Sequence, residues 1–164
     1  MRLVVLVPWI LAWPALCLAQ AAPERQNWFG DPFFQISSAL PDCPTPAGPF
    51  ITEAEKRVQT HHRAERGTSC WQAGQCTRPN SYAYDQDIAQ AFRAALQREN
   101  EFADTTLWVT VQGRVVYIEG CARDDRIAPA LEAFARAIPD VQQAMALLYS
   151  PESPRPPYKL LTAP

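Results

Sequence analysis

Residues 106–120 read TLWVTVQGRVVYIEG, and this stretch decides the fold. Apolar side chains alternate with others along its first half, and one face is formed by Leu107, Val109 and Val111. A period of two predicts a strand that is buried on one face. Gln112-Gly113 supplies the residues of a tight turn, and a second strand is expected over 114–119 before Gly120 breaks the pattern. The stretch therefore predicts an antiparallel hairpin.

A helix is expected on each side of this hairpin. The preceding helix begins near Asp85 or Asp87, either of which can cap it, and its apolar face is formed by Ile88, Phe92, Ala95 and Leu96. The following helix begins at Asp124 or Asp125 and has the same kind of spacing at Ile127, Leu131, Phe134, Ala135 and Ile138. Both patterns predict amphipathic helices that pack on one face of the hairpin.

The apolar run from Val141 to Tyr149 is compatible with a strand or a helix, because several of its residues favour helix intrinsically. A third strand would widen the sheet toward independent stability, which favours the strand. The expected fold class is therefore α+β, with the order αββαβ over residues 84–149. Residues 150–164 are rich in proline and are expected to form an extended tail.

The stretch from Tyr84 to Leu148 resembles the BON domain, a bacterial module of osmotic-stress periplasmic proteins and envelope lipoproteins. The resemblance is carried by DIAQAFRAAL at 87–96, the hairpin LWVTVQGRVVYIEG at 107–120 and FARAIPDVQQAMALL at 134–148. Asp140 stands where the family usually has the glycine of an I-P-G-V joint, and aspartate tolerates turn conformations. The resemblance implies a non-catalytic module that binds phospholipid, another envelope component or its own copies. BON-like folds also build periplasmic rings in secretion systems.

Residues 1–21 have the features of a secretory signal peptide. Arg2 precedes an apolar run from Leu3 to Leu18, and small residues follow as a cleavage site. A lipid anchor on Cys17 is the alternative, although Leu16 stands where lipoprotein signals have a small residue. We expect export to the periplasm through a cleaved signal peptide.

Residues 22–83 are expected to form an N-terminal extension. Its first half, to residue 51, mixes prolines with aromatic residues that include Trp28, Phe29, Phe33 and Phe34, and it sustains neither helical nor strand periodicity. We expect an arm whose aromatic residues dock on the core, or else a segment that binds a partner. A helix is expected near 53–66, because Thr52 and Glu55 form a capping box and Gly67 is placed to end it.

Four cysteines remain after cleavage, and in an oxidising compartment they allow three pairings into two disulfides. The expected pairs are Cys70 with Cys76, which closes a short loop, and Cys43 with Cys121, which attaches the arm to the domain. A zinc site that uses His61, Glu65, Cys70 and Cys76 is the alternative. It is disfavoured because oxidation removes the thiolates, so no metal and no cofactor are expected.

Composition and motifs argue against two broad function classes. The formal net charge of −2 gives no general attraction to nucleic acid. The sequence contains no nucleophile elbow, phosphate loop or metalloprotease motif, so we do not expect an enzyme.

Trp108, Tyr117 and Arg114 are the candidate binding residues, because an aromatic hairpin face beside a cation suits a lipid headgroup layer or a protein interface. The alternative is that the arm covers them. The function expected is that of an exported binding protein of the cell envelope, with phospholipid or an envelope protein as partner. An accessory component of a secretion apparatus, acting through protein contacts and self-association, is the alternative.

Overall fold

A computed structural model describes residues 23–99, 101–150 and 153–161 of the chain. The expected signal peptide and Cys17 lie outside these ranges. Within them, none of the helices combines the length and the hydrophobicity needed to cross a bilayer.

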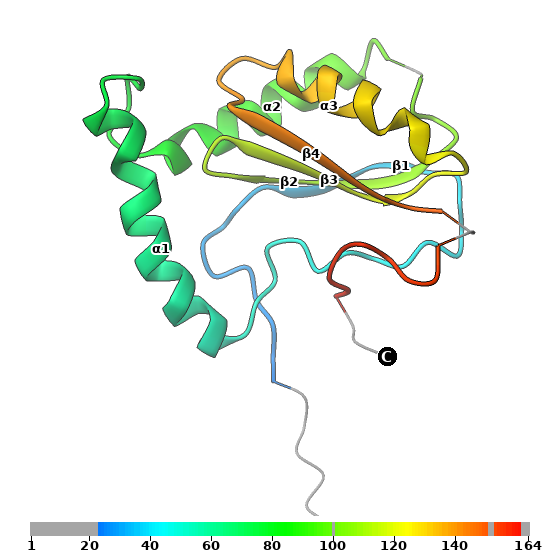
Figure 1. The fold of residues 1–164 in the computed structure, drawn as a ribbon, viewed down its shortest axis with the longest axis horizontal. Helices are drawn as coiled ribbons and strands as arrows, with labels where there is room; N and C mark the ends of the chain where they lie inside the picture. Colours follow the sequence, from blue (N-terminus) through cyan, green and yellow to red (C-terminus); the bar gives the residue numbers. More distant parts are fainter. Residues whose placement is uncertain (1–22, 100, 151–152, 162–164) are drawn as a thin grey trace, which may run out of the picture.

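A four-stranded sheet with the strand order β1-β2-β3-β4 forms the centre of the molecule (Figure 1). Its strands are β1 (Phe33–Ser38), β2 (Thr106–Gln112), β3 (Val115–Cys121) and β4 (Gln143–Tyr149). β1 and β3 are both antiparallel to β2, whereas β4 is parallel to β3. Helices α2 (Asp85–Leu96) and α3 (Ala128–Arg136) cover one face of the sheet. The expected order αββαβ is therefore present as α2-β2-β3-α3-β4.

The core lies between the two helices and the sheet. The alternation predicted for the hairpin places Leu107, Val109 and Val111 fully inside it. Phe92 of α2 is also fully buried and meets Phe134 of α3 edge to face, with 5.2 Å between ring centroids. Burial of such side chains is worth about 1.5 to 3 kcal/mol each and supplies most of the driving force for this arrangement.

β1 corrects the expectation that the arm contains no strand. Phe34 and Ile36 pack against the core, while Phe33 pairs with Thr110 on the neighbouring strand. The register shifts between Gln35 and Ser37, so the strand is irregular as well as short. A stretch this brief shows little periodicity by itself, and it becomes a strand because the edge of β2 offers unpaired backbone groups.

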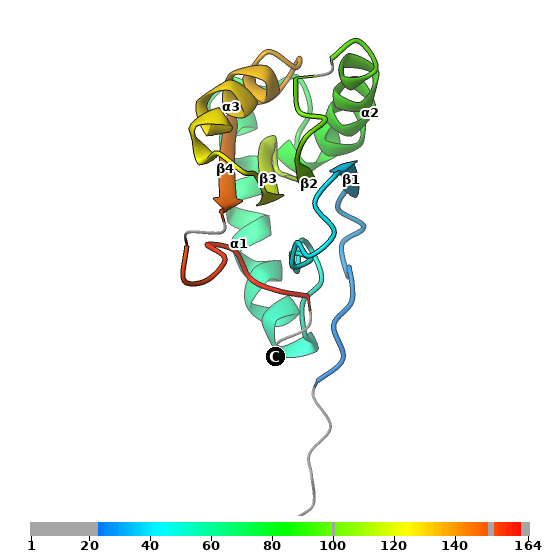
Figure 2. The ribbon, with the colours of Figure 1, turned by 90° about the vertical axis from the view of Figure 1, so that its right-hand side faces the viewer.

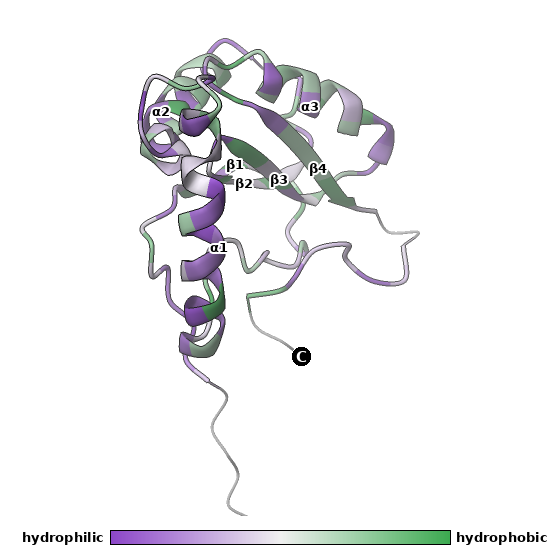
Figure 3. Cartoon of the chain, turned by 60° about the vertical axis from the view of Figure 1, so that its left-hand side comes forward, coloured by the Kyte–Doolittle hydropathy of each residue, from purple (hydrophilic) through white to green (hydrophobic). Residues whose placement is uncertain are grey.

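Helix α1 (Glu53–Gln72) begins at the expected capping box but continues past Gly67, where the sequence predicted its end. Gly67 serves a close approach, since a Cβ there would lie 2.8 Å from Oδ1 of Asn80. The chain turns at Gly74, whose φ is +68°. α1 extends away from the sheet (Figure 2). Most of its residues are hydrophilic (Figure 3).

Two aspartates that were expected to cap α2 and α3 make other contacts. Asp85 makes no side-chain cap to α2; its carboxylate instead accepts hydrogen bonds from the amides of Gly113, at 2.7 Å, and Arg114, at 2.8 Å. Those two residues form the hairpin turn with positive φ angles, one position later than predicted. Asp124 caps the short 3-10 helix η2 (Asp125–Ile127), which leads into α3.

The joint between α3 and β4 accommodates Asp140 in the conformation that glycine favours. Its φ is +66°, in the left-handed region that aspartate tolerates better than most residues. The replacement of the usual glycine therefore keeps the turn.

The arm and the tail lie together beneath the sheet, on the side away from α2 and α3 (Figures 1 and 2). The structure contains the expected disulfides Cys43–Cys121 and Cys70–Cys76. Pro46 of the arm pairs with Leu160 of the tail, and the Ala47 amide donates to the Lys159 carbonyl at 2.7 Å. Residues 158–161 of the tail are therefore docked on the arm.

Gly120→Ala should lower the free energy of unfolding by about 3 kcal/mol or more. Gly120 has a φ of +145°, and its Cβ would lie 2.1 Å from the Thr106 carbonyl oxygen. Gly74→Ala is the matched control, because its φ is also positive but nothing lies within 4 Å of the added carbon. It should cost only about 1 kcal/mol. Urea denaturation measures both, and equal losses would contradict the close approach of β2 and β3.

Removal of the two disulfides should have unequal effects. Cys43 and Cys121 are 78 residues apart, whereas Cys70 and Cys76 are six apart. The restriction of the unfolded chain grows with loop length, so the double serine variant of the first pair should lose about 4 kcal/mol and that of the second about 2 kcal/mol. Thermal and urea unfolding of both variants measure this. A smaller loss for the first pair would show that the arm is not held as described.

Candidate functional site

The face of the sheet opposite α2 and α3, called here the open face, carries the aromatic residues predicted to bind. Trp108 and Glu119 are cross-strand partners on this face, and Leu147 of β4 continues their row. The next row contains Phe33, Thr110, Tyr117 and Met145. Alternation along a strand places every second side chain here, so the sequence placed Trp108 and Tyr117 correctly on one surface.

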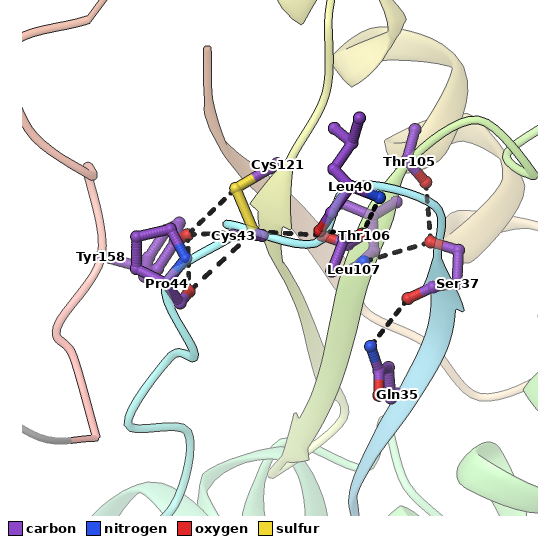
Figure 4. The surroundings of a disulfide bond; sticks show 10 residues. All are labelled: Gln35, Ser37, Leu40, Cys43, Pro44, Thr105, Thr106, Leu107, Cys121 and Tyr158. Carbon is purple, nitrogen blue, oxygen red and sulfur yellow. Dashed lines mark hydrogen bonds between the residues drawn. A yellow bond between two sulfur atoms is a disulfide. The ribbon is translucent and has the colours of Figure 1, made fainter. Parts of the chain in front are cut away.

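The arm and the tail cover part of the open face. Phe33 packs edge to face against Phe50 of the arm, with 5.8 Å between ring centroids. Tyr158 of the tail is buried, and its hydroxyl donates to the Pro44 carbonyl at 3.0 Å, beside the disulfide of Cys43 (Figure 4). Trp108 and Tyr117 keep partial exposure. The sequence left open whether the arm covers Trp108 and Tyr117 or leaves them accessible. In the structure the arm and the tail cover part of the face, and both aromatic side chains stay partly accessible.

Arg114 does not join this aromatic surface. Its Nε donates to the Asp140 carbonyl at 2.8 Å, and Nη1 lies 3.0 Å from Sγ of Cys76. Its guanidinium also lies 4.9 Å from the ring centre of Tyr84. Arg114 thus links the hairpin turn to the α3–β4 joint and to the cysteine loop, and the structure brings only Trp108 and Tyr117 together.

Glu119 is a residue of the open face that the sequence reasoning did not select. Burial raises the pKa of its carboxyl to about 7. Burial, together with the charges of Glu119 and Tyr149, raises the pKa of Tyr158 of the tail to about 12. The alternation pattern could have drawn attention to it, as an acidic residue on an aromatic face.

The open face also contains a buried hydroxyl without a partner. Oγ1 of Thr110 makes no hydrogen bond within the described part of the chain, although the residue is 3% exposed. Unsatisfied buried polar groups cost free energy and invite a binding partner or an ordered water. The face therefore combines aromatic surface, a titratable carboxyl and a free hydroxyl, a composition that suits an amphipathic partner.

The histidines and cysteines do not assemble a metal site. Over the ranges that the structure describes, no group of three or more His, Cys, Asp or Glu residues has a suitable arrangement. His61 lies 3.2 Å from Glu65 on exposed helix surface, and the nearby thiols of Cys70 and Cys76 are joined to each other. The zinc alternative therefore has no support from these residues.

Stability should depend on pH through Glu119 and Asp85. Each carboxyl has a folded pKa above its ordinary value, about 7 against 4.5 for Glu119 and about 6 against 3.8 for Asp85, mainly because of burial. The protonated forms are therefore favoured by folding. Their contribution is complete below the ordinary pKa values and is lost as the pH rises through the folded ones.

At about pH 8, Glu119→Gln should raise the free energy of unfolding by roughly 1 to 3 kcal/mol, because it removes an ionised buried group. Asp85→Asn should lower it by a similar amount, since an amide cannot accept from both turn N–H groups through two oxygens. Urea unfolding from about pH 4 to pH 8 measures both variants. A Glu119→Gln protein whose stability depends on pH as strongly as that of the unsubstituted protein would contradict this assignment.

Comparison with known proteins places the central part of the chain in a family. Residues 84–144 match the family model described as the BON domain. The match runs from the N-cap of α2 to the second residue of β4, and the arm, α1 and the tail lie outside it. No curated protein and no solved structure matches the chain. BON domains are modules of envelope and osmotic-stress proteins that bind other components. Residues 84–144 of this chain form a BON domain.

Proposed function

We propose that this chain is a non-catalytic binding protein of the cell envelope, exported to the periplasm, that holds a phospholipid or another envelope component. The match of residues 84–144 to the BON domain is the observation that carries the proposal. The apolar and small-residue pattern of 1–21 supports export, and the fold supports binding through a surface of the sheet.

The open face is the proposed contact surface. The other face is closed by α2 and α3, and its side chains form the core. On the open face, Trp108, Tyr117 and Leu147 retain partial exposure. Tryptophan and tyrosine rings present an apolar body and a polar edge, which suits the boundary between lipid headgroups and acyl chains.

The direct test is co-sedimentation of the mature, disulfide-bonded protein with vesicles of phosphatidylglycerol, phosphatidylethanolamine or a mixture of the two. We expect binding that Trp108→Ala and Tyr117→Ala each weaken by about tenfold, a loss of about 1.4 kcal/mol for one amphipathic ring. Circular dichroism checks that each variant keeps the fold.

Trp71→Ala is the matched control, because Trp71 is 49% exposed and belongs to α1 rather than to a strand of the sheet. Its removal should leave vesicle binding unchanged. If Trp71→Ala lost as much vesicle binding as Trp108→Ala, the binding would be nonspecific insertion of tryptophan. If the protein bound none of the vesicles, the proposal that it holds a phospholipid would be wrong. If light scattering then showed discrete oligomers, the secretion-apparatus alternative would be favoured.

A further inference from the structure

A second surface feature lies at one end of the sheet, where the end of α1 meets the hairpin turn and the beginning of β4. Its lining residues Val115 and Gln143 form the row after Tyr117 on the open face, but neither Trp108 nor Tyr117 lines it. It is a pocket of about 480 Å³. Polar side chains from four separate segments line much of it: Arg66, Ser69, Gln75, Ser81, Gln142 and Gln143. A volume of this size suits a small ligand. Neither the family match nor the predicted site accounts for this concentration of hydrogen-bonding groups.

Ser81 gives the pocket a buried group without a partner. The residue is 4% exposed, and its Oγ makes no hydrogen bond to any residue that the structure describes. It lies close beneath the turn, since a Cβ on Gly113 would be 3.4 Å from this oxygen. A buried hydroxyl is costly to leave unsatisfied, and a ligand oxygen in the pocket would provide its acceptor.

Arg66 gives the pocket a positive charge that no acidic lining residue offsets. Among the described residues it forms no ion pair, whereas Arg63, one turn earlier on α1, is held by both carboxylate oxygens of Asp31 at 2.8 and 2.6 Å. The carboxylate of Asp85 lies nearby but accepts from two turn amides and does not line the pocket. Arg66 is therefore available to a ligand.

The walls of the pocket are fixed before any ligand binds. The Cys70–Cys76 disulfide joins the last turn of α1 to the loop that contains Gln75. The turn at Gly113 is held by Asp85, and the Arg114 carbonyl accepts from the Gln142 amide at 2.9 Å. A site whose walls are already ordered loses less conformational entropy on binding.

We infer that this pocket binds a small oxyanion, of the phosphate-ester class, through Arg66 and the Ser81 hydroxyl. A guanidinium presents paired N–H donors that match phosphate oxygens, and the neutral amides and hydroxyls around it add donors without adding negative charge. The phosphate can belong to a soluble ester or to a lipid headgroup. This site goes beyond the proposed function, because neither Trp108 nor Tyr117 lines it and its ligand is tested with variants of other residues.

Titration of the mature, disulfide-bonded protein with glycerol phosphate, followed by amide chemical shifts, tests the inference. We expect saturable shifts at Gly113 and Gln143, and an affinity that Arg66→Gln lowers by about tenfold. Arg57→Gln removes the same charge from an exposed position of α1 outside the pocket and should leave the affinity unchanged. Ser81→Ala should weaken binding severalfold without lowering the unfolding midpoint, because the hydroxyl has no structural partner.

The source of the phosphate is separated in a second arm with phosphatidylglycerol vesicles. If the headgroup is the ligand, glycerol phosphate competes with the vesicles and Arg66→Gln reduces co-sedimentation. If the ligand is a soluble ester, neither added glycerol phosphate nor Arg66→Gln affects vesicle binding, while the titration with glycerol phosphate still saturates. The inference is overturned if no saturable shift occurs at Gly113 and Gln143, if Arg57→Gln weakens binding as much as Arg66→Gln, or if Ser81→Ala leaves the affinity intact.

Discussion

The disulfide between Cys43 and Cys121 fixes the arm at one end of β3, and the remaining contacts of the arm and the tail depend on it. With that end held, β1 lies along β2, and the backbone groups at the edge of the hairpin are paired instead of exposed. The same attachment brings Tyr158 of the tail against Pro44, so both flanking segments share one anchor. A proline-rich extension with few helical or strand signals is thereby made part of the folded unit.

This attachment also determines the chemistry of the open face. A three-stranded sheet with helices on one side would leave Trp108, Tyr117 and Glu119 in water. The arm and the tail remove part of that water, which raises the pKa of Glu119 to about 7 and leaves the hydroxyl of Thr110 without a partner. The face is therefore neither a closed core nor an ordinary polar surface.

Much of the BON domain could be predicted from the sequence because its signals are local. The alternation around Val109 and the helical spacing around Phe92 and Leu131 are each contained within a few turns or one strand, and the family pattern spans the same residues. The Cys70–Cys76 pair was also predictable from its short loop, and the expected attachment of the arm to the domain then paired Cys43 with Cys121. β1 was not, because its identity as a strand comes from the edge of β2, about 70 residues away. Gly67 was misleading for a similar reason, since its small size serves contact with Asn80 and not the end of a helix.

The candidate binding residues likewise divide into those that local sequence pattern predicts and those that only the folded chain brings together. Trp108 and Tyr117 were predictable because alternation alone places them on one face. Arg114 was close to them in sequence, yet its positive φ turns it toward Asp140 and the cysteine loop. The pocket around Ser81 was beyond sequence reasoning, because helix, loop, turn and strand converge there only in the folded chain.

Native-state hydrogen exchange of two amides, Ala39 and Val111, tests most directly whether the arm is part of the sheet, because their hydrogen bonds join the two ends of β1 to β2. The Val111 amide donates to the Pro32 carbonyl at 3.0 Å, and the Ala39 amide donates to the Thr105 carbonyl at 2.9 Å. Both should exchange as slowly as amides at the centre of the β2–β3 hairpin, through opening of the whole domain. Exchange of Ala39 and Val111 at the rate of an unfolded peptide, while the hairpin remains protected, would contradict the account.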